Sequence, residues 1–198
     1  LINRYPDMLI EGCSGGGGRF DAGMLYYTPQ IWCSDDTDAI ERLSIQYGTS
    51  FGYPVSTMGS HVSHCPNEQT RRIAPLNTRA TVAMSGTFGY ELDVNKMSEE
   101  EKEIVKTQIQ EFKEYYDLIQ YGYYYRLTNP DAVEAYHGWE FAAPDGSEAL
   151  LCIVALQIHP NGPGRWMRLK GLKKDSIYTV DGREYAGDVL MNGGLLLP

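Results

Sequence analysis

A cluster of carboxylates next to a tryptophan is the part of this sequence best suited to acid–base chemistry. Asp35, Asp36 and Asp38 lie within four residues of one another, and Trp32 precedes them. They come at the end of residues 30–34, a short run that predicts a buried strand. Like charges held this close raise the pKa of at least one carboxyl, and a raised pKa suits a general acid near neutral pH. The adjacent indole could stack on a sugar ring.

The same carboxylates could instead begin a helix. Residues 39–47 have helical spacing, and Thr37 or Asp36 is a plausible N-cap, since acidic residues in a first turn suit the helix dipole. For Asp36 and Asp38 we favour capping. For Asp35 the spacing leaves capping and catalysis equally open.

A glycine run over residues 15–18 forms a second candidate site, between Cys13 and Asp21. Glycine lets backbone N–H groups approach a ligand closely. The run lacks the lysine of a phosphate-binding P-loop and the spacing of a dinucleotide-binding turn. The alternative is a flexible loop in which Arg19 pairs with Asp21.

Two histidines, His61 and His64, have a spacing that can bind a metal, but only Cys65 accompanies them. We expect a loop-packing role, no metal site and no cofactor.

The composition excludes several classes of partner. The formal net charge is −9 and no basic run is present, so nucleic acid and anionic membranes are poor partners. No apolar run is long enough to span a bilayer. The cysteines form no C-x-x-C pair, which favours reduced thiols in a cytoplasmic protein. They are Cys13, Cys33, Cys65 and Cys152.

Strand, polar loop and helix alternate through residue 121. The predicted strands are residues 7–11, 30–34, 54–58 and 89–93, and the predicted helices are residues 39–47, 78–86 and a long one that begins at the capping box Ser98–Glu101. This order predicts a parallel α/β sheet or barrel, in which the polar loops, residues 59–64 among them, build the active site.

Short alternating segments separated by turns, such as Asp181-Gly182, replace this pattern after Gly122 and predict an antiparallel β-domain. The predicted domains are residues 1–121 and residues 122–198. Because half a barrel leaves open sheet edges, we expect the chain to be an incomplete part of a larger protein, with the β-domain truncated.

Six segments, taken as a set, carry a family resemblance: residues 11–21, 23–32, 34–43, 45–50, 56–63 and 89–93. They resemble glycoside hydrolase family 36, the bacterial and fungal α-galactosidases. The resemblance implies an α/β plus all-β chain: part of a (β/α)8 TIM barrel, about strands 5–8, followed by an antiparallel β-sandwich domain. Small departures are Cys33, where the family has Thr, and Ala22, where it has Pro.

The resemblance also implies roles for individual residues. Asp35 matches the acid/base of the family's Ser-Asp-Asp motif. Trp32 matches a residue of the galactose pocket, and Cys13 and Gly15 match residues that lie against the sugar. The family's nucleophile is an Asp in a Lys-Trp-Asp motif, which this sequence does not contain.

The expected function is therefore retaining hydrolysis of terminal α-D-galactosyl residues, as in melibiose or raffinose, by a longer protein that we expect to be a homo-oligomer. The 198-residue chain by itself should be inactive. Three alternatives remain open: an α-N-acetylgalactosaminidase of the same family, a non-catalytic carbohydrate-binding fragment that uses residues 122–198, and a structural fragment whose carboxylates only cap helices.

Overall fold

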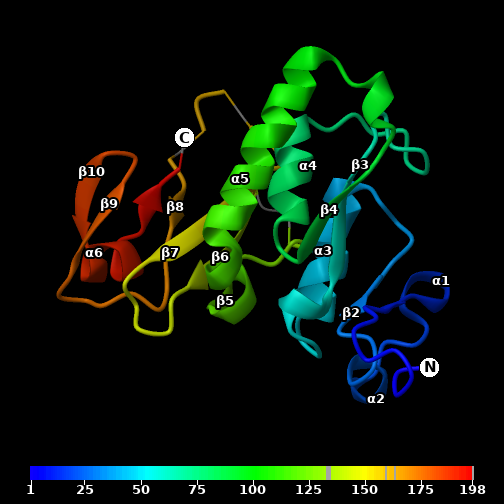
Figure 1. Cartoon of the computed structure of the whole chain (residues 1–198). Helices are drawn as coiled ribbons and strands as arrows, with labels where there is room; N and C mark the ends of the chain where they lie inside the picture. The colour runs from blue at the N-terminus through cyan, green and yellow to red at the C-terminus, as the bar shows by residue number, and fades with distance from the viewer. Residues whose placement is uncertain (133–134, 159, 163, 198) are drawn as a thin grey trace. The chain divides into compact units, whose positions relative to one another are not determined.

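The computed structural model describes residues 1–132, 135–158, 160–162 and 164–197. The chain forms two compact units, Leu1–Lys113 and Glu114–Pro198 (Figure 1). The long helix α5, Glu99–Tyr121, contributes residues to both units. No helix within the described ranges is long and apolar enough to cross a membrane.

The first unit is built from parallel strands that follow one another in chain order. These strands are β1 (Glu11–Gly12), β2 (Gln30–Ile31), β3 (Gly59–Ser63) and β4 (Thr87–Glu91). β1 pairs with β2, Ile31 bridges to Met58 at the start of β3, and β3 pairs with β4. Helices separate successive strands, as parallel pairing requires. The predicted α/β alternation is confirmed, although the strands of the described residues form small sheets and not a closed barrel.

The helices of this unit vary widely in length. They are α1 (Ser14–Gly17), α2 (Ala22–Leu25), α3 (Ala39–Thr49), α4 (Leu76–Ala83) and the start of α5, with 3-10 turns η1 (Val55–Thr57) and η2 (Val94–Lys96). The capping box that begins α5 is confirmed: the Ser98 N–H donates to Glu101 Oε2 at 2.9 Å, and the Glu101 N–H donates to Ser98 Oγ at 3.1 Å.

The strand predicted over residues 54–58 is wrong, because β3 occupies the next five residues, which the sequence indicated as a polar loop. Ser60 and Ser63 of β3 are buried. Their hydroxyls donate to Gln46 Oε1 at 2.8 Å and to the Thr37 carbonyl at 2.9 Å. A buried hydroxyl with a partner avoids most of the desolvation penalty, so small polar residues can form an interior strand.

The second unit is antiparallel, as predicted. Its main sheet has the strand order β5 (Tyr123–Arg126), β6 (Tyr136–Ala142) and β7 (Ala149–Ala155). Two smaller sheets have two strands each: β8 (Trp166–Met167) pairs with β11 (Leu195–Leu196), and β9 (Ile177–Val180) pairs with β10 (Arg183–Ala186). Helix α6 (Gly187–Asn192) comes between β10 and β11 in the chain. Asp181 and Gly182 connect β9 to β10 with φ values of 49° and 76°, the left-handed conformation that favours glycine.

Two titratable side chains of β6 are buried in this unit. Glu140 is fully buried, and burial raises its pKa to about 7 although Oε2 accepts the Lys170 N–H at 2.9 Å. Its Oε1 has no hydrogen-bond partner among the described residues. His137 is 3% exposed, and burial lowers its pKa to about 4.

These two shifts act on folding stability in opposite directions. The folded pKa of Glu140 lies above its ordinary value of 4.5, so stability is lost as the pH rises from 4.5 to about 7. The folded pKa of His137 lies below its ordinary value of 6.5, so stability is lost as the pH falls from 6.5 to about 4. Between these limits the two effects partly cancel.

Glu140→Gln should therefore make the chain more stable relative to the parent at about pH 8 than at about pH 5, because the variant has no buried carboxylate to ionise. Urea denaturation at both pH values measures the two free energies of unfolding. Glu148→Gln, at an exposed position of the same unit, is the matched control and should follow the parent. Parallel pH dependence of Glu140→Gln and the parent would contradict the prediction.

Candidate functional site

Asp38 caps helix α3, and the predicted N-cap at Thr37 or Asp36 is wrong. Asp38 Oδ1 accepts the N–H groups of Ile40 at 2.8 Å and Glu41 at 3.4 Å. Asp36 Oδ1 accepts the Asp38 N–H at 2.9 Å, which closes a tight turn before the helix. Capping is therefore confirmed for Asp38, and Asp36 shapes the turn that leads into it.

The buried Asp38 carboxylate is a structural anion. Arg72 Nη1 lies 2.7 Å from Oδ1, and the Thr70 hydroxyl donates to Oδ2. Burial by itself raises the pKa of Asp38, but the hydrogen bonds from Thr70, from the Ile40 N–H and from Arg72 outweigh it and lower the pKa. This direction is the opposite of the one a general acid needs.

Asp35 is the exposed member of the carboxylate cluster. Its carboxylate makes no hydrogen bond or ion pair with any residue that the structure describes. Its backbone is held: the Asp35 carbonyl accepts from Gln69 Nε2 at 2.8 Å, while Gln69 Oε1 accepts the Thr37 N–H at 3.0 Å. The loop is thus fixed through its main chain, and the Asp35 side chain is left available to a ligand.

The glycine run packs against the backbone of the Asp35 loop. Gly15, Gly16 and Gly17 have φ values of 66°, 70° and 97°, so α1 is a left-handed turn that L side chains rarely adopt. A Cβ on Gly16 would lie 2.7 Å from the Asp35 nitrogen, and one on Gly17 would lie 2.9 Å from the Cys33 carbonyl oxygen. A Cβ on Gly15 would meet nothing within 4 Å. Two of the glycines therefore permit close contact between the loops.

Cys13 and Gly15 lie on the exposed side of this turn. The proposed pairing of Arg19 with Asp21 is not what the structure has, because Asp21 Oδ1 accepts the Met24 N–H at 2.9 Å and caps α2. The glycine run is therefore a shaped turn, and its outer face, with Cys13 and Gly15, is free of side-chain cover.

Trp32, directly after β2, contacts two other side chains through its ring. Its ring stacks on His61 with centroids 4.7 Å apart and an interplanar angle of 23°. The Arg42 guanidinium carbon lies 4.7 Å from the centre of the same ring. The indole is therefore fixed in orientation while remaining partly exposed.

Arg42 is the site residue that the sequence did not indicate. It is 3% exposed and donates to the Ser34 carbonyl at 3.1 Å, the Gly59 carbonyl at 2.5 Å and Gln46 Oε1 at 3.2 Å. Burial lowers the pKa of Arg42, and nearby acidic groups, including Asp36, oppose this shift. One signal was available: Arg42 and Gln46 are four residues apart and share a face of α3 that is buried.

The two histidines do not converge on one point. His61 Nδ1 lies 3.5 Å from Glu91 Oε2, and His64 Nε2 lies 3.5 Å from Glu68 Oε1. In the part of the chain that the structure describes, no three His, Cys, Asp or Glu side chains group in a way that could hold a metal ion.

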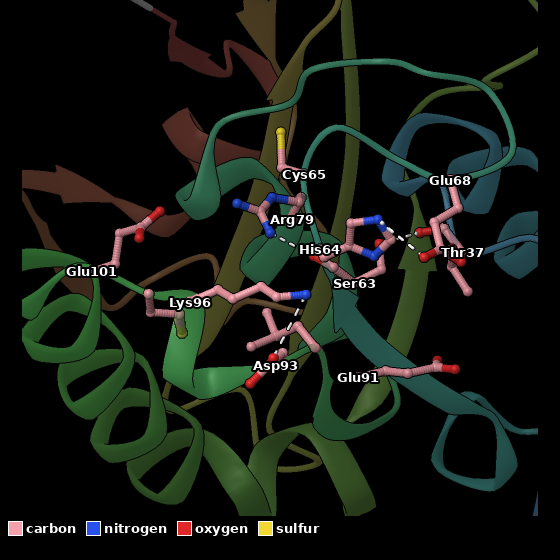
Figure 2. A pocket seen from close by; sticks show the side chains of 12 residues that line it. Thr37, Ser63, His64, Cys65, Glu68, Arg79, Glu91, Asp93, Lys96 and Glu101 are labelled. Atoms are coloured by element: carbon pink, nitrogen blue, oxygen red, sulfur yellow. Dashed lines mark hydrogen bonds and ion pairs between the residues drawn. The ribbon is translucent and has the colours of Figure 1, made fainter.

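A pocket of about 510 Å³ adjoins the Asp35 loop. It lies at the ends of β3 and β4, and Thr37 forms part of its wall (Figure 2). Its lining does not include Asp35, Trp32, Cys13 or Gly15. The structure therefore brings the glycine turn and the Asp35 loop into backbone contact and places a separate hollow beside them.

Known proteins match this chain along its whole length. The Melibiase family model matches residues 1–122, and the model described as the glycosyl hydrolase family 36 C-terminal domain matches residues 136–198. The bifunctional α-galactosidase/sucrose kinase AgaSK of Mediterraneibacter gnavus is 52% identical over 202 residues, covering 100% of this chain and 21% of the relative. The α-galactosidase AgaA of Geobacillus stearothermophilus is 50% identical over 200 residues, covering 100% of this chain and 27% of the relative.

Solved structures give the same result. The galactosidase domain of AgaSK matches with a TM-score of 0.96 and 52% identity, covering 100% of this chain and 28% of that one. A variant of AgaA in complex with raffinose matches with a TM-score of 0.95 and 49% identity, and the match covers 100% of this chain and 27% of that one. The chain thus spans about a quarter of the length of these relatives.

The two neighbouring glycines offer a matched test of the loop contact. Gly16→Ala and Gly15→Ala impose similar left-handed strain, roughly 1–2 kcal/mol each, but only the first places a Cβ against the Asp35 backbone. Gly16→Ala should therefore lower the free energy of unfolding by about 1 kcal/mol or more beyond Gly15→Ala. Urea denaturation of both variants measures the difference, and equal losses would show that the contact contributes nothing.

Proposed function

Since this chain belongs to the Melibiase family, we propose that it supplies the acid/base carboxylate and part of the galactose pocket of a retaining α-galactosidase. The proposal rests on the exposure of the Asp35 carboxylate. Its loop is held by main-chain hydrogen bonds, while its carboxylate is exposed and makes no interaction with the described residues. A general acid must reach its substrate freely, and a capping residue cannot.

In the proposed reaction Asp35 acts twice. It first donates its proton to the glycosidic oxygen, so that the leaving sugar departs as a neutral alcohol while a nucleophilic carboxylate attacks the anomeric carbon. It then removes a proton from water, which attacks the same carbon and releases galactose with retained configuration. Retaining enzymes hold the two carboxyl groups roughly 5–5.5 Å apart. The second carboxylate lies outside these 198 residues, because the sequence has no Lys-Trp-Asp motif.

The galactose would rest against Trp32, Cys13 and Gly15. The Trp32 indole is fixed in orientation by His61 and Arg42 and stays partly exposed, and Gly15 leaves its side of the turn uncovered. The substrate class is a terminal α-D-galactoside of an oligosaccharide such as melibiose or raffinose. The names of the relatives favour this substrate over α-N-acetylgalactosamine, since they are α-galactosidases.

The proposal extends to the architecture of the longer protein. Four parallel strands in chain order support residues 1–121 as about strands 5–8 of a (β/α)8 barrel, and the antiparallel unit supports residues 122–198 as part of a β-sandwich. The four cysteines are free thiols, in keeping with a cytoplasmic enzyme. We further propose a homo-oligomer in which α-galactosides are the ligands and no cofactor takes part.

In the longer protein that contains this chain, Asp35→Asn should lower kcat/KM for raffinose by about 10²–10⁴-fold, the usual contribution of general acid–base catalysis. An aryl α-galactoside with a good leaving group needs little protonation, so its first step should persist and the glycosyl-enzyme should accumulate. Pre-steady-state release of the aryl alcohol measures that step.

Asp36→Asn is the matched control for this assignment. It removes one charge but keeps the side-chain oxygen that accepts the Asp38 N–H. It should not show the leaving-group dependence. If Asp36→Asn shows that dependence and Asp35→Asn does not, the acid/base has been assigned to the wrong carboxylate.

The 198-residue chain by itself should not hydrolyse an aryl α-galactoside, because it carries only one carboxylate of the pair. Release of the aryl alcohol by the purified chain, followed by absorbance, tests this. Appreciable turnover that Asp35→Asn abolishes would mean that the chain contains its own nucleophile.

A further inference from the structure

A second pocket, on the antiparallel unit, carries positive charge in a chain that is acidic as a whole. Its volume of about 600 Å³ falls within the range of roughly 300–1,000 Å³ typical of small-molecule sites. Its charged side chains are Arg165, Arg168 and Lys170, and no carboxylate belongs to its described lining. The formal net charge of the chain is −9. The pocket therefore has the opposite sign to the whole protein, and its charge favours an anionic ligand.

Main-chain hydrogen bonds hold both ends of the segment that carries these cations. The Arg165 carbonyl accepts the Leu197 N–H at 2.8 Å, and the Lys170 N–H donates to Glu140 Oε2 at 2.9 Å. Met167, in strand β8 between them, is buried (Figure 1). A ligand at this position would meet donors on a fixed backbone, so less conformational entropy is lost on binding.

The alternation of buried and exposed residues places three ligand-binding side chains on one side of this segment. Met167 and Leu169 are buried. Trp166, Arg168 and Lys170, which alternate with them, are exposed and line the pocket. Successive side chains of an extended chain point to opposite faces, so an indole, a guanidinium and an ammonium project to the same side.

The three cations have no partner within the described structure. Arg165, Arg168 and Lys170 make no side-chain hydrogen bond or ion pair with any residue that the structure describes. Glu140 accepts the main-chain N–H of Lys170 and does not pair with its ammonium. A guanidinium offers a planar set of donors that fits carboxylate or phosphate oxygens, and an ammonium offers three more donors. These unpaired donors favour a ligand rich in acceptor oxygens.

The number of charges and the exposed indole narrow the class of ligand. A carboxylate carries one negative charge, whereas a phosphate monoester carries about −1.5 to −2 near pH 7 and has three strong acceptor oxygens. Three cations match the phosphate better. Trp166 is 63% exposed and lies beside these cations in the lining. The organic part of an ester would cover some of this apolar surface, which inorganic phosphate would leave in water.

We propose that this pocket binds a phosphate monoester, with Arg165, Arg168 and Lys170 around the phosphate and Trp166 against the organic part. The site is separate from the proposed glycosidase reaction, because every described lining residue belongs to the antiparallel unit and none is a proposed galactose-site residue. Sugar phosphates and nucleoside monophosphates share this chemistry, and the binding experiment distinguishes the two sources.

Calorimetry on the longer protein that contains this chain measures affinity for glucose 6-phosphate, adenosine 5′-monophosphate, inorganic phosphate and neutral glucose. At least one monoester should bind with a Kd below about 1 mM, more tightly than inorganic phosphate, and the tighter one identifies the source. Arg168→Ala and Lys170→Ala should each weaken that binding by about 3- to 10-fold, between the effect of an exposed ion pair and that of a buried charged hydrogen bond. Trp166→Ala should weaken the monoester and leave inorganic phosphate unchanged.

Arg183→Ala is the matched control, since Arg183 is an exposed arginine of the same unit that does not line the pocket. It should leave every affinity unchanged. Equal weakening by Arg183→Ala and Arg168→Ala would mean that net charge alone attracts the anion, and it would overturn the inference. The inference also fails if neither monoester binds, if glucose binds as tightly as its phosphate, or if inorganic phosphate binds as tightly as both monoesters. Loss of α-galactoside hydrolysis in the Asp35 variant bears on the proposed function and not on this site.

Discussion

The arrangement of this site depends on the hydrogen bonds that the buried Arg42 guanidinium donates. A charge in a protein interior is costly unless its donors are paired. Arg42 meets that condition by donating to the Ser34 and Gly59 carbonyls and to Gln46. These acceptors belong to the Asp35 loop, to the start of β3 and to α3, so one side chain joins three segments. Trp32 lies over the same guanidinium, which couples the orientation of the indole to the same centre.

The three neighbouring carboxylates show how environment separates residues of the same chemical type. Asp38 is buried among donors and is committed to the helix. Asp36 closes the turn through a main-chain N–H. Asp35 gives only its carbonyl to the fold, through Gln69. Because the other two carboxylates and Gln69 fix the backbone, the Asp35 side chain can serve a ligand without weakening the loop that carries it.

Close approach of backbones explains why glycines surround this region. Side chains at Gly16 and Gly17 would collide with the Cys33 and Asp35 main chain. A side chain at Gly59 would meet the Trp32 ring at 3.2 Å. Parallel strands direct their carboxyl ends to one edge of a sheet, so the segments that follow β1, β2 and β3 gather there. Removing side-chain volume at these points lets the segments pack through their main chains.

The sequence alone determined the alternation of strand and helix, the change to antiparallel structure, the capping box of α5 and the carboxylate cluster, because each depends on residues close together in the chain. The tertiary structure decided which carboxylate caps α3, since that choice depends on Arg72 and Thr70, more than thirty positions away. It also placed the strand at Ser60 and Ser63, whose hydroxyls have partners on other segments. Which side chains become buried, and which distant residues they pair with, cannot be read from local spacing. Those long-range contacts use Asp38 and the Asp35 carbonyl, and they leave the Asp35 carboxylate exposed.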